Sequence, residues 1–170
     1  MKKYENKDVI INDINIVINS DLSPNAKTEL LHSLAWAYTE NDGKIKGCEY
    51  WSVEAIKKYE KIIQNEKIRD KNKEFSKILR HEHVVPRNIF VNSVINKKCE
   101  ITKEDLEGRL VGCVVTKEET DFLDKMYKTK HPDGADFFNI KNVWGRYEGI
   151  IEYTKVSWES GKRTKKMITK

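Results

Sequence analysis

The sequence LVGCVV at Leu110–Val115 decides the fold. It is the clearest strand in the chain, because it is apolar throughout and β-branched at its end, a pattern typical of strands that are buried on both faces. Thr116 follows at once, and Glu119 stands three residues later, which is the spacing of a capping box. We therefore expect a helix containing Phe122 and Leu123 to begin directly after this strand.

Helical patterns surround this strand on both sides. Helices are predicted from Pro24 after the N-cap Ser23, from Val53 after the N-cap Ser52, over Arg87–Asn96, and from Thr102 to about Gly108. The first 20 residues fit either a helix or a strand. Ile150–Val156 is expected to pair with Leu110–Val115. The fold class is therefore α+β, a helix-rich single domain over residues 1–170 with a small sheet of two to four strands, and with residues 159–170 as a flexible basic tail.

The composition excludes several classes of protein. The chain has 170 residues, and no apolar run approaches the roughly 20 residues that a membrane span needs. No signal peptide is predicted at the N-terminus. The three cysteines, Cys48, Cys99 and Cys113, are widely spaced and form no CxxC pair. They indicate neither a disulfide framework nor a structural zinc site, so we expect a cytoplasmic protein with no membrane partner.

The positive charge is concentrated in two stretches. Residues 57–80 hold nine basic and four acidic residues, and residues 155–170 hold six basic residues and one acidic one. Clustered Lys and Arg attract polyanions because they release counterions from phosphate backbones, although an exposed helix with internal ion pairs gives the same pattern. The residues expected to contact nucleic acid are Lys57, Lys58, Lys61, Lys73, Lys77, Lys162 and Arg163.

One short segment concentrates the titratable groups, with the sequence LRHEHVVPRN over residues 79–88. Within it, Glu82-His83-Val84-Val85-Pro86 resembles the core of the HNH, or ββα-metal, nucleases. In that family an acidic residue, a histidine, two apolar residues and a proline end the first strand of a metal-binding finger. The resemblance implies that Glu82 ligates a divalent cation, Mg²⁺ or Mn²⁺, and that His83 acts as general base on the attacking water. It also implies a further ligand from the next helix, Asn92 or Asn96.

These residue types suit the hydrolysis of a phosphodiester. Imidazole titrates near neutral pH and can activate water, while a divalent cation stabilises charge on the phosphoryl oxygens. Arg80 and Arg87 can bind phosphate oxygens through two donors each. The candidate catalytic residues are thus His83, Arg80 and Arg87, and the candidate metal ligands are Glu82, His81, Asn92 and Asn96.

The same segment has two other interpretations. If residues 80–85 form a strand, His81 and His83 share one face and can chelate a metal, and the third ligand would come from His131, Glu118 or Asp121. Alternatively, the segment is structural: the histidines bond to the backbone, and Glu82 pairs with Arg80 or Arg87.

A second segment, Trp144-Gly145-Arg146-Tyr147, places an arginine between aromatic residues. It fits either a stacking platform for a base or a core aromatic pair beside an arginine. The chain resembles one bacterial family in three segments, HEHVVPR, VVTKEE and WGRYEGI. This resemblance implies no particular activity.

Two functions follow from these patterns. The first is a metal-dependent nuclease, or a degenerate HNH-like nucleic-acid-binding protein. The alternative is a non-catalytic binding module that acts on nucleic acid or on a partner protein in a phage, mobile-element or defence setting.

Overall fold

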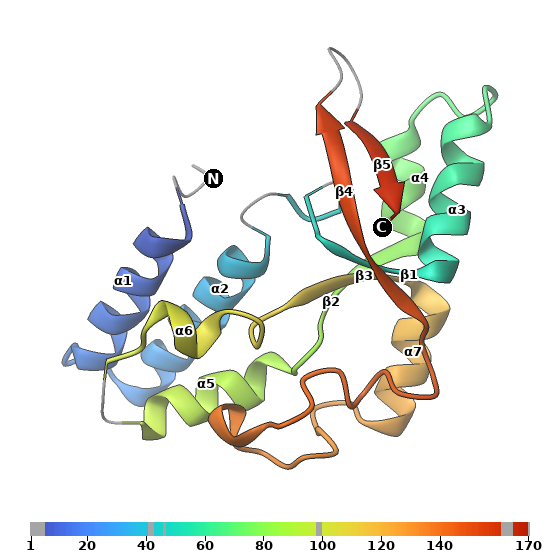
Figure 1. Cartoon of the computed structure of the whole chain (residues 1–170). Helices are drawn as coiled ribbons and strands as arrows, with labels where there is room; N and C mark the ends of the chain where they lie inside the picture. The colour runs from blue at the N-terminus through green and yellow to red at the C-terminus, as the bar shows by residue number, and fades with distance from the viewer. Residues whose placement is uncertain (1–5, 41–42, 46, 98–99, 161–164, 170) are drawn as a thin grey trace.

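Helices and short strands alternate along the chain in a computed structural model that describes residues 6–40, 43–45, 47–97, 100–160 and 165–169 (Figure 1). In chain order the elements are α1 (Lys7–Asn19), α2 (Pro24–Thr39), β1 (Tyr50–Ser52), α3 (Val53–Gln64), α4 (Lys71–Ile78), β2 (Leu79–His83), α5 (Arg87–Asn96), α6 (Lys103–Leu106), β3 (Gly112–Thr116), α7 (Lys117–Met126), a 3₁₀ turn (Phe137–Asn139), β4 (Tyr153–Ser160) and β5 (Lys165–Thr169). No described helix has both the length and the apolar character needed to cross a membrane. The helix-rich α+β fold class expected from the sequence is confirmed.

The strands lie in the order β2-β3-β1-β4-β5. β1 and β3 are parallel, whereas the other neighbouring pairs are antiparallel. The four strands β2, β3, β1 and β4 form the mixed sheet, and β5 pairs only with the distal half of β4 as a hairpin. β2 is an edge strand, because it pairs with β3 alone among the described residues.

One expectation about the strands needs correction. Ile150–Val156 does not pair with Leu110–Val115, because the three-residue strand β1 lies between β3 and β4. Within the segment 159–170, which is expected to be a flexible basic tail, β4 continues to Ser160 and β5 covers Lys165–Thr169, and the expectation stays a prediction. Lys162 and Arg163 lie outside the described residues.

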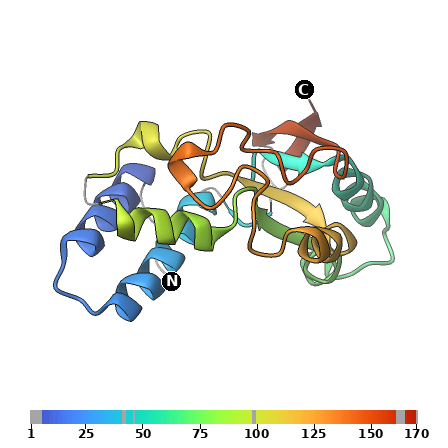
Figure 2. The same ribbon diagram turned by 90° about the horizontal axis from the view of Figure 1, so that it is seen from below.

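Three apolar clusters hold the elements together. α1, α2, α5 and α6 enclose one cluster at one end of the molecule, as Figures 1 and 2 show. α3 and α4 pack on one face of the sheet through a second cluster around Trp51, Tyr59 and Phe75. α7 packs on the opposite face through a third cluster that includes Leu123 and Tyr147. The ambiguous first segment is the helix α1, whose buried side chains recur at helical spacing.

Side-chain caps mark most of the helix starts. Six of the seven described α-helices have one, contributed by Asn6, Ser23, Ser52, Asp70, Thr102 and Thr116. The caps expected at Ser23, Ser52, Thr102 and Thr116 are therefore confirmed. The exception is α5, which begins after Pro86 without a side-chain cap.

Glu119 joins the two places where a strand runs directly into a helix. Because β1 and β3 are parallel neighbours, their carboxyl ends meet at the starts of α3 and α7. Ser52 Oγ accepts a hydrogen bond from Ala55 N and donates one to Glu119 Oε2, at 3.0 and 2.7 Å. The same carboxylate oxygen accepts the Thr116 N–H at 2.7 Å. One side chain thus satisfies donors from both junctions.

We expect Glu119→Ala to lower the free energy of unfolding by about 2–3 kcal/mol, because it removes a charged acceptor shared by two donors, one of them on the buried Ser52. Urea unfolding measures this loss. Glu118→Ala is the matched control, since Glu118 is exposed and forms a surface ion pair with Lys58, and it should cost less than about 0.5 kcal/mol. Equal losses in the two variants would contradict the role given to Glu119.

Candidate functional site

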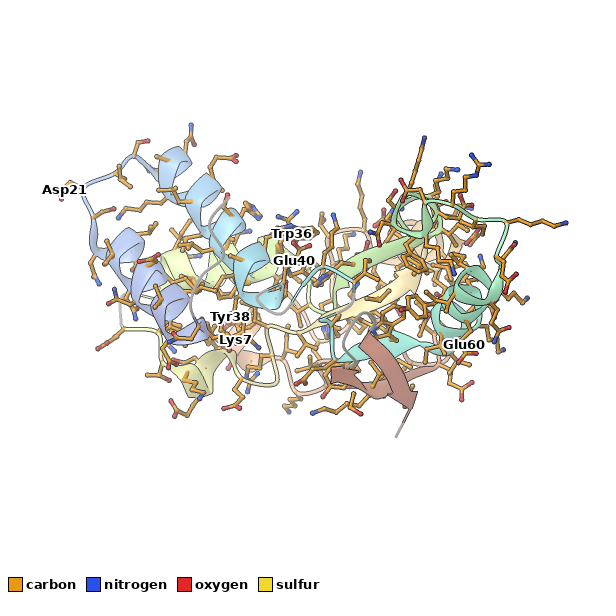
Figure 3. All side chains as sticks on the ribbon, turned by 90° about the horizontal axis from the view of Figure 1, so that it is seen from above. Lys7, Asp21, Trp36, Tyr38, Glu40 and Glu60 are labelled. Carbon is orange, nitrogen blue, oxygen red and sulfur yellow. The ribbon has the colours of Figure 1, made fainter. Side chains whose placement is uncertain are left out.

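β2 carries the histidines of the nuclease-like segment on one face and Glu82 on the other, as the two-residue period of a strand requires. His81 and His83 both face Trp36 of α2. The His83 ring stacks on the indole with 4.9 Å between ring centroids, and the His81 ring lies 5.5 Å away. Figure 3 shows Trp36 and Glu40 on the side of α2 that faces the sheet.

His83 is almost fully buried. Its residue is only 5% exposed, and Nε2 lies 3.1 Å from the Thr39 hydroxyl. Burial lowers the pKa of His83 well below its ordinary value, and the neighbouring His81 and Arg87 add to the effect. A general base must reach the water that it activates, and the ring of His83 is instead packed between Trp36 and the sheet.

His81 is held in the same way. It is 4% exposed, and its Nδ1 lies 3.0 Å from the Lys44 carbonyl oxygen, so that nitrogen carries the proton. Nε2 has no hydrogen-bond partner among the described residues. It lies over Gly112, where an added Cβ would come within 2.1 Å of it. Burial lowers the pKa of His81 to about 4, so the ring is neutral at pH 7.

Glu82 lies on the α7 side of the sheet, among different neighbours. Burial raises the pKa of this carboxyl group, and the opposing effect of the Arg146 charge does not compensate for it. The expected cooperation of Glu82 with His83 is therefore not found, because the two side chains leave the strand in opposite directions. Asn92 and Asn96, the expected partners in a metal site, are exposed on α5.

The structure shows one part of the arrangement on which the second metal hypothesis depends, and that hypothesis stays a prediction. His81 and His83 do share a face, but the proposed third ligands lie elsewhere. His131 accepts from Asp133 N and bonds to the Val143 carbonyl, and Glu118 pairs with Lys58. Asp121 is an exposed residue of α7. In the described part of the chain, no three or more His, Cys, Asp or Glu side chains are grouped so that they could hold a metal ion.

A cavity of about 330 Å³ opens beside β2, and we call it the β2-edge cavity. It is lined by His32, Trp36, His81, Glu82, His83, Pro86, Arg87, Asn88, Lys128, Thr129 and Arg146. Three of these side chains are permanent cations, and one is a carboxylate. The sequence pattern found Arg87, but it did not connect Arg87 with Lys128, which follows α7.

Arg146 is the most deeply buried cation of this cavity. It is 2% exposed, and its guanidinium donates to the carbonyl oxygens of His83 at 3.2 Å and Lys128 at 3.5 Å. Its Nε has no hydrogen-bond partner in the described structure. Trp144 and Tyr147 on either side form an edge-to-face pair at 5.3 Å, which agrees with the core interpretation of this segment.

A second hollow also lies beside β2, at Leu79 and Arg80. It has a volume of about 400 Å³ and is lined by Lys44, Ile45, Asn72, Phe75, Ser76, Leu79 and Arg80. Lys44 of this second hollow lies near Trp36 of the first, with its Nζ 5.3 Å from the centre of the Trp36 ring. Arg87 lies 4.7 Å from the same ring. We call the two hollows together the β2 groove.

The lysines expected to bind nucleic acid are partly neutralised on the surface. Lys57 pairs with Glu54 at 3.6 Å, Lys58 with Glu118 at 2.7 Å and Lys77 with Glu74 at 2.9 Å. Lys61 and Lys73 are exposed residues of α3 and α4. By contrast, the cations of the β2 groove form no ion pair with a described residue; they are Lys44, Arg80, Arg87, Lys128 and Arg146.

Comparisons with known proteins assign the chain to no family: no protein family matches it, and neither the curated proteins nor the solved structures give a match.

We expect the buried histidines to make folding sensitive to acid. The unfolded chain binds protons on His81 below its ordinary pKa of 6.5, whereas the folded chain resists protonation until about pH 4. The stabilisation from His81 is therefore complete above pH 6.5 and is lost as the pH falls toward 4. It amounts to about 2 kcal/mol between pH 7.5 and 5.0, and His83 acts in the same direction.

Urea unfolding at these two pH values measures the effect. The raised pKa of Glu82 acts in the opposite direction, so the comparison with a variant isolates His81. Between pH 7.5 and 5.0, the His81→Gln variant should lose about 2 kcal/mol less of its free energy of unfolding than the wild type. His32→Gln is the control: His32 is half-buried, and its replacement should leave most of the pH dependence of stability intact. Parallel pH curves for wild type and His81→Gln would show that this ring is not a buried neutral group.

Proposed function

We propose that the protein is a nucleic-acid-binding module that holds the phosphate backbone in the β2 groove and does not cleave it. The observation that carries this proposal is the set of cations beside β2 that form no ion pair with a described carboxylate, although the charges of Glu40 and Glu82 act on some of them. Unpaired Lys and Arg side chains along one groove attract a polyanion, whereas paired surface lysines contribute little.

Trp36 supports the choice of nucleic acid among polyanions. Its half-buried indole lines the β2-edge cavity, and cations from Lys44 and Arg87 lie over the ring. Grooves that bind single strands combine cations that follow the backbone with aromatic side chains near the bases. The positions of these cations are also restrained: Arg80 Nη1 donates to the Ser76 carbonyl at 2.7 Å, and Arg146 is buried. Restrained donors lose less side-chain entropy on binding.

The arrangement of the histidines supports binding over hydrolysis. His83 is buried against Trp36, and the carboxylate of Glu82 lies on the other face of the strand. The imidazoles of His81 and His83 thus support the wall of the groove, and the arginines provide the contacts with phosphate.

We expect a labelled single-stranded oligonucleotide, as DNA or RNA, to bind with an affinity that falls as salt rises from about 50 to about 200 mM. Three to five phosphate contacts predict a slope of about −2 to −3.5 in log K against log salt, measured by fluorescence anisotropy. Lys44→Gln/Arg80→Gln should weaken binding about tenfold and flatten the slope by about 1.4, since it removes two phosphate contacts.

The matched control is Lys57→Gln/Lys77→Gln, which removes two positive charges that already pair with carboxylates. Its affinity should stay within about twofold of the wild type. Plasmid DNA and RNA incubated with Mg²⁺ or Mn²⁺ should remain intact. The proposal would be contradicted by new strand ends in the DNA or RNA that form with the metal ion but not in the presence of a chelator. Equal losses of affinity in the two double variants would also contradict it.

A further inference from the structure

The first turn of α5 opens into the β2-edge cavity without a cap. Pro86, Arg87 and Asn88 line the cavity, and no described side chain bonds to the start of this ten-residue helix. The amides of Ile89 and Phe90 turn back to the Pro86 carbonyl, whereas those of Arg87 and Asn88 have no acceptor among the described residues. Such unpaired amides, together with the helix dipole, favour an anion.

A buried arginine gives a second and independent indication of a ligand. Arg146 is 98% buried, lines the cavity and leaves Nε without a hydrogen-bond partner in the described structure. It has only carbonyl oxygens as partners, and no described carboxylate lies within 4 Å of it. No described carboxylate is in ion-pair contact with this buried guanidinium, and Glu82 acts on it only through its charge, so an anion in the cavity would supply additional counter-charge.

The loop after α7 brings a third cation to the same place. Asn88 Nδ2 donates to the Thr129 carbonyl at 3.2 Å, which fixes this loop against the first turn of α5. Lys128, the preceding residue, lines the cavity and is exposed. Its φ of 44° lies in the left-handed region, which a lysine adopts only at a cost in energy.

We propose that the β2-edge cavity binds a phosphate monoester, the terminal phosphate of a nucleic-acid chain or of a nucleotide, through the first amides of α5 and through Arg87, Lys128 and Arg146. Three permanent cations face one carboxylate, Glu82, which leaves an excess of two positive charges. A monoester carries close to two negative charges at pH 7, whereas an internal diester carries one. The choice of a nucleic-acid end as the source rests on the proposed function.

Lys128→Gly is the variant that separates binding from folding. It removes a cation of the cavity, and glycine adopts a φ of 44° without strain, so the free energy of unfolding should not fall. Lys130→Ala is the matched control, because Lys130 is exposed two residues away and does not line the cavity. Both variants lose one positive charge from the same loop.

Three probes are compared at constant ionic strength and pH 7.5: inorganic phosphate and AMP by calorimetry, and one oligonucleotide with a phosphate or a hydroxyl at its ends by anisotropy. We expect inorganic phosphate and AMP to bind, and the phosphorylated oligonucleotide to bind about tenfold more tightly than the unphosphorylated one. Lys128→Gly should weaken all phosphate-dependent binding about five- to tenfold, and Lys130→Ala less than twofold.

The outcomes distinguish the two proposals. If phosphate and AMP bind in a Lys128-dependent way but neither oligonucleotide does, the phosphate site stands, its ligand is a free nucleotide, and the proposed function is wrong. If both oligonucleotides bind equally and Lys128→Gly behaves like Lys130→Ala, the monoester site is overturned while nucleic-acid binding stands. Absence of phosphate and AMP binding also overturns the site.

Discussion

In β2, successive side chains leave the strand on opposite faces of the sheet, and the chemistry available to this segment depends on that alternation. His81 and His83 are directed toward α2, where Trp36 covers both rings. Glu82 is directed toward α7, where the charge with the largest effect on its pKa is that of Arg146. A strand cannot bring adjacent side chains to one point. The side chains of His81 and His83 therefore lie in one environment and that of Glu82 in another. The imidazoles become part of the core, and the polar edge of the strand is left for the arginines.

The same edge position explains why cationic groups gather beside β2. No further strand covers this edge in the described structure, and the segments that approach it are α2, the first turn of α5 and the loops after α7. The first turn of α5 and the loops after α7 leave donors there, whereas α2 also brings the carboxylate of Glu40 near His81. Arg146 donates to the His83 carbonyl at the end of the strand, and α5 begins without a cap. The groove therefore combines a rigid wall with an excess of positive charge, which suits the binding of an anion.

The sequence predicts local features of this protein better than distant ones. The caps Ser23, Ser52, Thr102 and Thr116 were predictable because the hydrogen bonds of a cap involve residues only three apart. β1 was not, because a strand of three residues is too short to show a period, and its neighbours in the sheet come from distant parts of the chain. The histidine segment marked the correct strand, but not which neighbours would bury each side chain. Arg146 lies 63 residues from the carbonyl that it binds, and no local pattern encodes that contact.

The central claim is that the start of α5, and not the imidazole of His83, meets the phosphate. An NMR titration of ¹⁵N-labelled protein with a phosphorylated oligonucleotide tests it most directly. The backbone amides of Arg87 and Asn88 and the Nε–H of Arg146 should shift in a saturable way, while the imidazole signals of His81 and His83 stay those of neutral rings. If those amides stay unchanged, or if the His83 signals shift and broaden when Mg²⁺ or Mn²⁺ is added with the oligonucleotide, the account is contradicted.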